Sequence, residues 1–329
     1  MRRTGIIFVL SILMITPLLG QNLTNVIFTF NSTAPDNTLR TMERNAKAVF
    51  EEINKASNEN RTPRFSSANI TSDGINRILA LWATSSFHFI EPAYNTNVSI
   101  SIRNQYAVRG ISVIFDEIKD EKKRWQDLVI EFEKETGKVS NITNVLEKHQ
   151  YTKIIPNNKV IDLRYRQYII EFVEEFRTAY NRQDVDLIEK MFNDDALIIS
   201  GTKITKIIDG RYVTRSTYTT QNKIQYINKL RKAIMPQVNG KFVNKINVDF
   251  EDIEVMQGNE EKVYLVKLWQ KWDSKGQINY NDEGWLTLVI DFTNEEKPTI
   301  WVRAWEDLPR NQKADTYDFN CFYNPNACK

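Results

Sequence analysis

The residues best suited to chemistry lie in the C-terminal half of the 329-residue chain, where aromatic side chains surround isolated polar ones. On a predicted strand over 299–305, Arg303 stands between Trp301 and Trp305, and the two-residue spacing puts all three side chains on one face. An arginine flanked by indole rings can stack on them and present its guanidinium fork to a carboxylate. The pattern is equally typical of a surface cation whose stem covers aromatic rings, so both interpretations stay open.

Aromatic residues recur along the other predicted strands and on a facing helix. They can line an amphipathic pocket for an apolar or aromatic ligand, or fill a core or a sheet face buried in a dimer. Aromatic residues favour strands on propensity alone, so the pattern does not decide between a pocket and a filled core. The candidate pocket residues are Phe172, Phe176, Tyr180, Asp195, Tyr212, Trp269, Trp285, Arg303 and Trp305.

Several kinds of chemistry lack the residues they need. The sequence contains no glycine-rich phosphate loop, no metal-binding spacing of His, Cys and Asp, and no Ser-His-Asp set. Both histidines, His88 and His149, fall in the first half, and His88 is predicted to be structural. No catalytic residue, metal or cofactor is therefore assigned. The net charge of +2 is too small to steer the chain to nucleic acid or to an anionic membrane.

The first twenty residues predict export. Arg2 and Arg3 precede an apolar run from Gly5 to Gly20, which is the pattern of a secretory signal. The run is short for a membrane span, so an uncleaved anchor is the alternative, and it would be the chain's one contact with a membrane. In an exported, periplasmic or extracellular chain, Cys321 and Cys328 predict a disulfide, with two free thiols as the alternative.

The length predicts two domains. Residues 21–155 indicate an N-terminal α+β domain after a polar lead-in. A helix begins near Asp36, a second covers 72–82, and strands at 86–90, 98–102 and 106–115 precede a hairpin that turns at Gly137. A proline- and asparagine-containing stretch at 151–160 marks the boundary to the second domain.

Residues 161–310 have a sharper pattern. A helix with an apolar stripe ends at 181–183, and Asp184 is placed to cap a second helix. A strand follows from Ala196, then a hairpin near 209–210 and a third helix predicted over 219–235. Four strands, at 245–255, 262–272, 284–292 and 299–305, complete the domain, and residues 311–329 form a tail.

Two motifs in this half resemble the signature of the nuclear transport factor 2-like (NTF2-like) superfamily, in particular its SnoaL-like and ketosteroid-isomerase-like branches. They are Ala179-Tyr180-Asn181 with Asp184, and the run from Phe192 to Ala196. The resemblance covers about residues 161–308. It implies an α+β fold whose C-terminal domain is a cone of three helices packed on a curved, mostly antiparallel sheet. The N-terminal half is unassigned, and a divergent second copy of the same domain is one interpretation.

The resemblance also tests one kind of catalysis. Ketosteroid isomerase uses an Asp base, with a Tyr hydroxyl and a protonated Asp that stabilise the enolate. The Tyr position falls at Phe176, the base position at Ser200 and the second Asp near Leu288. An unactivated hydroxyl is no base near neutral pH, so isomerase chemistry is not expected.

The first hypothesis is accordingly an exported, non-catalytic protein that binds a small apolar or aromatic ligand or a protein partner and forms a homodimer. One alternative is a SnoaL-like hydratase, cyclase or isomerase that uses Asp195, Tyr212 or Arg303. A structural scaffold of the cell envelope is the other.

Overall fold

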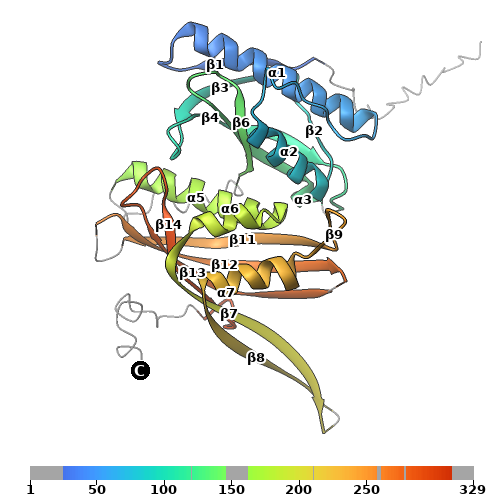
Figure 1. The fold of residues 1–329 in the computed structure, drawn as a ribbon, viewed down its shortest axis with the longest axis vertical. Helices are drawn as coiled ribbons and strands as arrows, with labels where there is room; N and C mark the ends of the chain where they lie inside the picture. The colour runs from blue at the N-terminus through green and yellow to red at the C-terminus, as the bar shows by residue number, and fades with distance from the viewer. Residues whose placement is uncertain are drawn as a thin grey trace, which may run out of the picture.

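The computed structural model describes residues 25–119, 121–145, 162–209, 211–257, 261–277 and 279–312. It contains two six-stranded sheets, one in each half of the chain, with helix α5 of the second half lying between them (Figure 1). The α+β class is therefore confirmed. The predicted signal segment, the boundary stretch 151–160, Cys321 and Cys328 lie outside the described residues.

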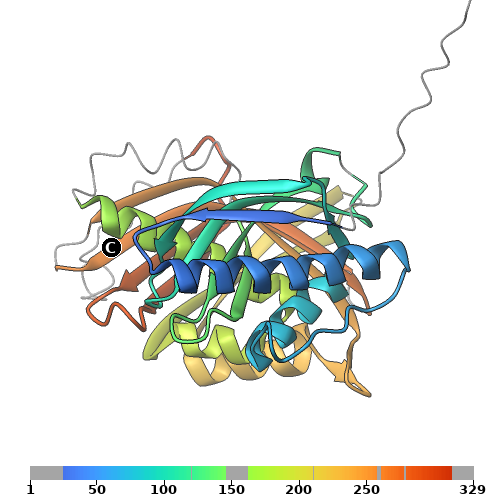
Figure 2. The same ribbon diagram turned by 90° about the horizontal axis from the view of Figure 1, so that it is seen from above.

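The N-terminal half is a meander of strands covered by two helices. Its elements are β1 (Ile27–Asn31), α1 (Asp36–Asn58), α2 (Ser72–Thr84), β2 (Phe87–Phe89), β3 (Ala93–Ile100), β4 (Tyr106–Phe115), α3 (Glu121–Arg124), β5 (Trp125–Phe132) and β6 (Val139–Asn144). The strand order is β1-β3-β4-β5-β6, and β2 pairs with β4. Both predicted helices are present, and α1 runs beside β1 (Figure 2). Gly137 turns the hairpin at φ +64°, as expected.

Part of the predicted polar lead-in before α1 is a strand. Residues 27–31 form strand β1, whose Phe28 and Phe30 side chains are buried while the residues between them are exposed. This strand pairs in parallel with β3, more than sixty residues further on. Its hydrogen bonds are thus all long-range, and a short alternating run in a polar segment is a weak local signal for them.

The C-terminal half has more elements, most of them strands. They are α5 (Leu163–Arg182), α6 (Val185–Met191), β7 (Phe192–Ile208), β8 (Arg211–Asn222), α7 (Lys223–Lys229), the π-helical turn η1 (Leu230–Ile234), β9 (Gln237–Val238), β10 (Lys241–Phe242), β11 (Asn244–Gln257), β12 (Val263–Gly276), β13 (Tyr280–Asp291) and β14 (Thr299–Glu306). The main sheet has the order β11-β12-β13-β14-β7-β8. Its neighbours are antiparallel except for the parallel pair β14–β7.

The corner between α5 and α6 forms as its sequence predicts. Gln183 adopts a left-handed conformation that ends α5, and the Asp184 carboxylate accepts a hydrogen bond of 3.0 Å from the backbone N–H of Leu187. An N-cap of this kind satisfies a free N–H group of the first helical turn. The cap fixes the direction in which the chain leaves α5 and enters the sheet through α6.

The third helix is shorter than predicted. Residues 219–222 belong to strand β8, and α7 begins only at Lys223. The threonines of this stretch are β-branched and favour a strand. Asn222 then starts the helix with a capping box, in which its side chain and that of Gln225 bond to each other's backbone N–H.

The two sheets do not share a strand order. In the N-terminal half the first strand pairs in parallel with β3, the first long strand of the meander. In the C-terminal half β7 pairs in parallel with β14, the last strand. The connectivity therefore lends no support to the interpretation of the N-terminal half as a second copy.

Ion pairs join the two halves across α5. Arg77 on α2 contacts Glu175 at 3.1 Å, and Arg109 on β4 contacts Glu174 at 2.7 Å. The side chain of Glu174 is 1% exposed. The Arg109 side chain is 23% exposed, so the carboxylate is the buried partner, and removal of the guanidinium would leave it charged in a desolvated site.

Candidate ligand-binding site

A cavity of about 320 Å³ opens between the C-terminal sheet and the α7–η1 segment. Its aromatic walls are Tyr226, Trp272, Tyr280 and Trp305, and its charged residues are Lys229, Asp282 and Arg303. Ligand pockets in proteins begin at about 300 Å³ and combine apolar walls with a few polar groups. The cavity therefore has the size and composition of a site for a small molecule.

The side chains reach the cavity because alternate residues of a strand share a face. Gln270 and Trp272 come from β12, Asp282 from β13, and Arg303 and Trp305 from β14. Trp301 departs from the predicted alternation. The pairing register shifts between Ile300 and Val302, and Trp301 packs with residues of the other face, including Val302. The prediction that Trp301, Arg303 and Trp305 share a face is wrong at Trp301, because a β-bulge changes the side on which later residues lie.

Two glycines make room for the Trp305 ring. A Cβ atom at Gly201 on β7 would overlap that ring, and one at Gly284 on β13 would lie 2.6 Å from its Cζ2 atom. Glycine permits such close approach of a side chain to the backbone. The ring therefore lies flat against two strands and forms one wall of the cavity.

Arg303 is the central polar group of the cavity. It is 4% exposed, and its Nη2 donates a hydrogen bond of 3.1 Å to Gln270 Oε1. Its Cζ atom lies 5.5 Å from the ring centroid of Tyr226, a cation–π distance. Among the described residues, its Nε finds no hydrogen-bond acceptor and no carboxylate forms an ion pair with it. The alternative of a surface cation is therefore wrong.

The charge of Arg303 persists in spite of its burial. Burial lowers the pKa of the guanidinium, but the nearby Tyr226, Tyr180 and Asp282 side chains more than offset this and raise the pKa overall. Behind the cavity, the hydroxyls of Tyr180 and Tyr226 lie 2.5 Å apart. Burial raises the pKa of the Tyr180 hydroxyl well above its usual range. The site thus presents a permanent cation, with the two phenol hydroxyls behind it.

Two further titratable groups face the cavity. The Tyr280 hydroxyl donates to one carboxylate oxygen of Asp282, and the other oxygen, Oδ1, has no partner among the residues described. Burial raises the pKa of Asp282. Burial and the nearby Arg303 lower the pKa of Lys229, which forms no ion pair with any described residue.

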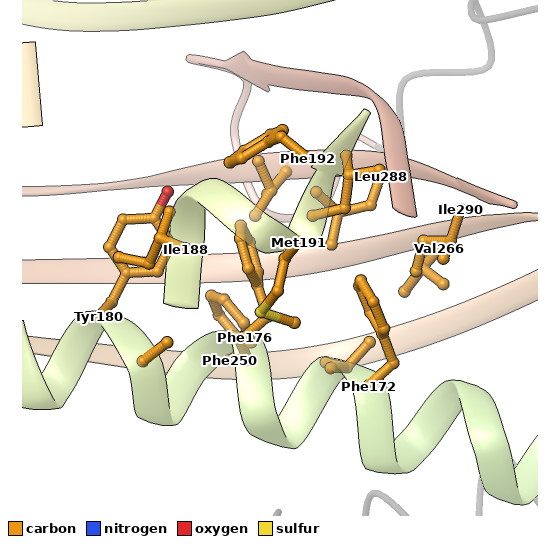
Figure 3. Close-up of a cluster of buried hydrophobic side chains, with 14 of the residues drawn as sticks. Phe172, Phe176, Tyr180, Ile188, Met191, Phe192, Phe250, Val266, Leu288 and Ile290 are labelled. Carbon is orange, nitrogen blue, oxygen red and sulfur yellow. The ribbon is translucent and has the colours of Figure 1, made fainter. Parts of the chain in front are cut away.

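The predicted pocket residues divide between the cavity and its surroundings. Arg303 and Trp305 line the cavity, and Tyr180 is one hydrogen bond away from it. Phe172 and Phe176 instead point from α5 into the packed core beside Phe250 and Leu288 (Figure 3). These two phenylalanines thus belong to the packed core, whereas Arg303 and Trp305 lie beside the cavity.

Four of the proposed pocket residues lie elsewhere. Trp269 and Trp285 occupy the other face of the sheet, with ring centroids 5.3 Å apart, since they alternate with the residues that face inward. Asp195 is exposed at the start of β7. Tyr212 is 80% exposed on β8, near the tip of a hairpin that projects beyond the rest of the sheet (Figure 1).

The ketosteroid-isomerase positions are also accounted for. Phe176 and Leu288 are fully buried in the core. Ser200 lines the cavity, and its hydroxyl donates a hydrogen bond of 3.4 Å to Gln221 Oε1. The base position therefore faces the cavity and carries no carboxylate.

Six prominent cavity residues are absent from the candidates chosen from the sequence: Tyr226, Lys229, Gln270, Trp272, Tyr280 and Asp282. For Gln270 a signal existed, because it is two residues before Trp272 on a predicted strand. Tyr280 and Asp282 lay before the predicted start of their strand, and Lys229 lay within a helix whose face toward the sheet depends on where β8 ends. No local pattern brings these three together.

Neither a metal site nor a membrane span stands out in the described part of the chain. It holds no group of three or more His, Cys, Asp or Glu side chains arranged to bind a metal ion. Among the described helices, none is long and apolar enough to cross a membrane. His88 bonds to Asp116 at 2.9 Å, and this bond gives it a structural partner.

No family model and no curated protein matches the chain. The chain does match solved structures. Naphthalene 1,2-dioxygenase with indole bound in its active site is 9% identical and covers 50% of this chain and 90% of its own, at a TM-score of 0.35. The β subunit of benzoate 1,2-dioxygenase from Burkholderia mallei is 14% identical. The match covers 45% of this chain and 91% of that subunit, at a TM-score of 0.33. An NTF2-like protein from Cytophaga hutchinsonii is 14% identical. The match covers 44% of this chain and 98% of that protein, at a TM-score of 0.32.

These similarities, one of them to an NTF2-like protein, each cover half of this chain or less. Identities at this level concern the fold alone, so function must be argued from the cavity.

Proposed function

We propose that the C-terminal half is an NTF2-like cone, built of α5, α6 and α7 on its curved sheet, that binds a small aromatic ligand without transforming it. The observation that carries the proposal is the open cavity of about 320 Å³ with Tyr226, Trp272 and Trp305 in its walls. Planar rings stack favourably on aromatic side chains. The few polar groups of such a pocket fix the orientation of the ligand.

The absence of a base at Ser200 and of a hydroxyl at Phe176 supports binding over isomerase chemistry. The SnoaL-like enzyme remains a second candidate on one observation, the unpartnered Oδ1 of Asp282 in the cavity. Of the residues first considered for such an enzyme, Asp195 and Tyr212 lie outside the cavity. An enzyme of this type would depend on Asp282 and Arg303. Turnover of a bound aromatic compound that the Asp282→Asn substitution abolishes would establish this second candidate.

Export to the periplasm or the extracellular space belongs to the same proposal. Its support is the basic and apolar pattern of residues 1–20. A disulfide between Cys321 and Cys328 and a homodimer remain predictions that accompany it. Amino-terminal sequencing of the protein from a periplasmic fraction would show cleavage after Gly20, whereas an intact start in the cytoplasm would refute export.

The binding proposal is tested by calorimetric titration of the full chain with a panel of one- and two-ring aromatic compounds. Ser200→Phe should abolish binding because it fills the cavity. Thr219→Phe is the matched control: Thr219 is the exposed cross-strand partner of Ser200 and does not line the cavity. Binding that survives Ser200→Phe, or no binding by any member of the panel, would overturn the proposal.

A further inference from the structure

We infer that the ligand of this cavity is an aromatic carboxylic acid, bound as its anion by Arg303 and Lys229. The inference rests on the proposed function and narrows it to one chemical class of ligand. Its basis is the balance of charge in the cavity, which the aromatic walls alone do not determine.

The first observation concerns Arg303. A buried charge is ordinarily paired, because desolvation without a counter-ion is costly. Arg303 is 4% exposed and lines the cavity, and within the described chain no carboxylate forms an ion pair with it and its Nε has no acceptor. Its Nη2 bond goes to the neutral amide of Gln270. Asp282 helps to stabilise the guanidinium charge but forms no ion pair with it, so an anionic group in the cavity supplies a direct partner.

Lys229 adds a second, independent cation. It lines the same cavity from the end of α7 and is half-buried. No described carboxylate forms an ion pair with it. One surface cation nearby differs: Arg231, two residues further on, contacts both Asp186 and Glu189. Two cations that form no ion pair with any described residue thus face the same cavity.

The acid that lines the cavity does not balance these charges. Asp282 carries at most one negative charge against the two positive charges of Arg303 and Lys229. Its Oδ2 already accepts the Tyr280 hydroxyl. The cavity is therefore net positive whether Asp282 is ionised or neutral, and it attracts an anion.

The walls specify the rest of the ligand. Trp272 and Trp305 offer flat apolar surfaces to a ring, and the Arg303 guanidinium is held in place by Gln270 and by the Tyr226 ring. A guanidinium fixed in this way matches the planar, two-oxygen geometry of a carboxylate. A ring that carries a carboxylate fits both features in a cavity of about 320 Å³.

The test compares 2-naphthoate with 2-naphthamide, which has the same shape and no charge, by calorimetric titration of the full chain. One charge-assisted hydrogen bond corresponds to about 10- to 100-fold in affinity, so the acid should bind tighter by this factor. Arg303→Met should remove the preference while the amide still binds. Lys229→Met should reduce the preference for the acid over the amide. Because Lys229 is only half-buried, this variant provides the test if Arg303→Met fails to fold. Lys232→Met is the matched control, because Lys232 is exposed and outside the cavity lining.

The outcomes separate this inference from the proposed function. Equal affinity for acid and amide, or a preference that survives both substitutions, overturns the anion inference and leaves ligand binding intact. Absence of binding by both probes and by the whole aromatic panel overturns both. A preference that Arg303→Met and Lys229→Met reduce, and Lys232→Met does not, supports the inference.

Discussion

The hydroxyl of Tyr180 on α5 lies 2.5 Å from the hydroxyl of Tyr226 on α7, and both side chains are buried. The Tyr226 ring in turn lies 5.5 Å from the Arg303 guanidinium. This bond therefore ties the first helix of the C-terminal half to the helix that closes the cavity and holds the ring on which Arg303 rests.

Tyr226→Phe should weaken the fold while leaving the ring in place. The substitution removes the bond to Tyr180 and leaves that buried hydroxyl without this partner, which costs about 1–3 kcal/mol. Guanidinium chloride unfolding followed by circular dichroism measures the change. Tyr212→Phe, at an 80% exposed position, should change the free energy of unfolding by less than about 0.5 kcal/mol. Equal effects of the two substitutions would refute a structural role for the bond.

The stability of Asp282→Asn relative to the unaltered protein should depend on pH. Burial raises the pKa of Asp282 above its usual value of 3.8, so the folded state holds this proton more tightly than the unfolded state does. The stabilisation is present below the unfolded pKa and is lost as pH rises through the folded pKa. The Asp282→Asn variant has no carboxyl group to ionise at this position. Its free energy of unfolding should therefore rise relative to that of the unaltered protein as pH increases from about 3.8. Unfolding measured across the acidic range tests the sign, and a relative loss would contradict it.

The ion pair between Arg109 and Glu174 should be worth far more than an ion pair on the surface. Arg109→Met removes the guanidinium 2.7 Å from a carboxylate that is 1% exposed, and the loss should be about 3–5 kcal/mol. Arg231→Met is the matched control, because Arg231 pairs with Asp186 at an exposed site and should cost at most about 1 kcal/mol. Chemical unfolding of both variants decides the matter; similar losses would show that α5 does not depend on this pair.

Gly201→Ala should damage the fold and the cavity together. The added methyl group would overlap the Trp305 ring, and overpacking of this kind costs about 1–3 kcal/mol. The displaced ring should also reduce the affinity for an aromatic probe. Thr219→Ala, on the neighbouring strand, should alter neither property. Full stability and full affinity in the Gly201→Ala variant would show that the ring can move without consequence.

The local parts of the fold could be predicted from the sequence. The apolar stripe of α1, the Asp184 cap and the Gly137 turn each depend on residues within a few positions of one another. The predicted start of α7 is too early, because Thr219–Asn222 also fits a helical pattern. This stretch instead pairs with β7, and its partners there lie some twenty residues earlier in the chain.

The site was less predictable for the same reason. Arg303 and Trp305 could be chosen by alternation along one strand, yet Trp301 was misplaced by a bulge that no local pattern reveals. Lys229 and Asp282 become neighbours of Arg303 only through the packing of α7–η1 against the sheet. The sequence therefore indicates the strands that form the site, and the tertiary structure decides which side chains face one another.

The most direct test of the central claim is a crystal structure of the full chain grown with 2-naphthoate. We expect the rings to lie between Trp272 and Trp305, with the carboxylate within hydrogen-bond distance of Arg303. A cavity filled by protein side chains, or the probe bound anywhere else, would contradict it.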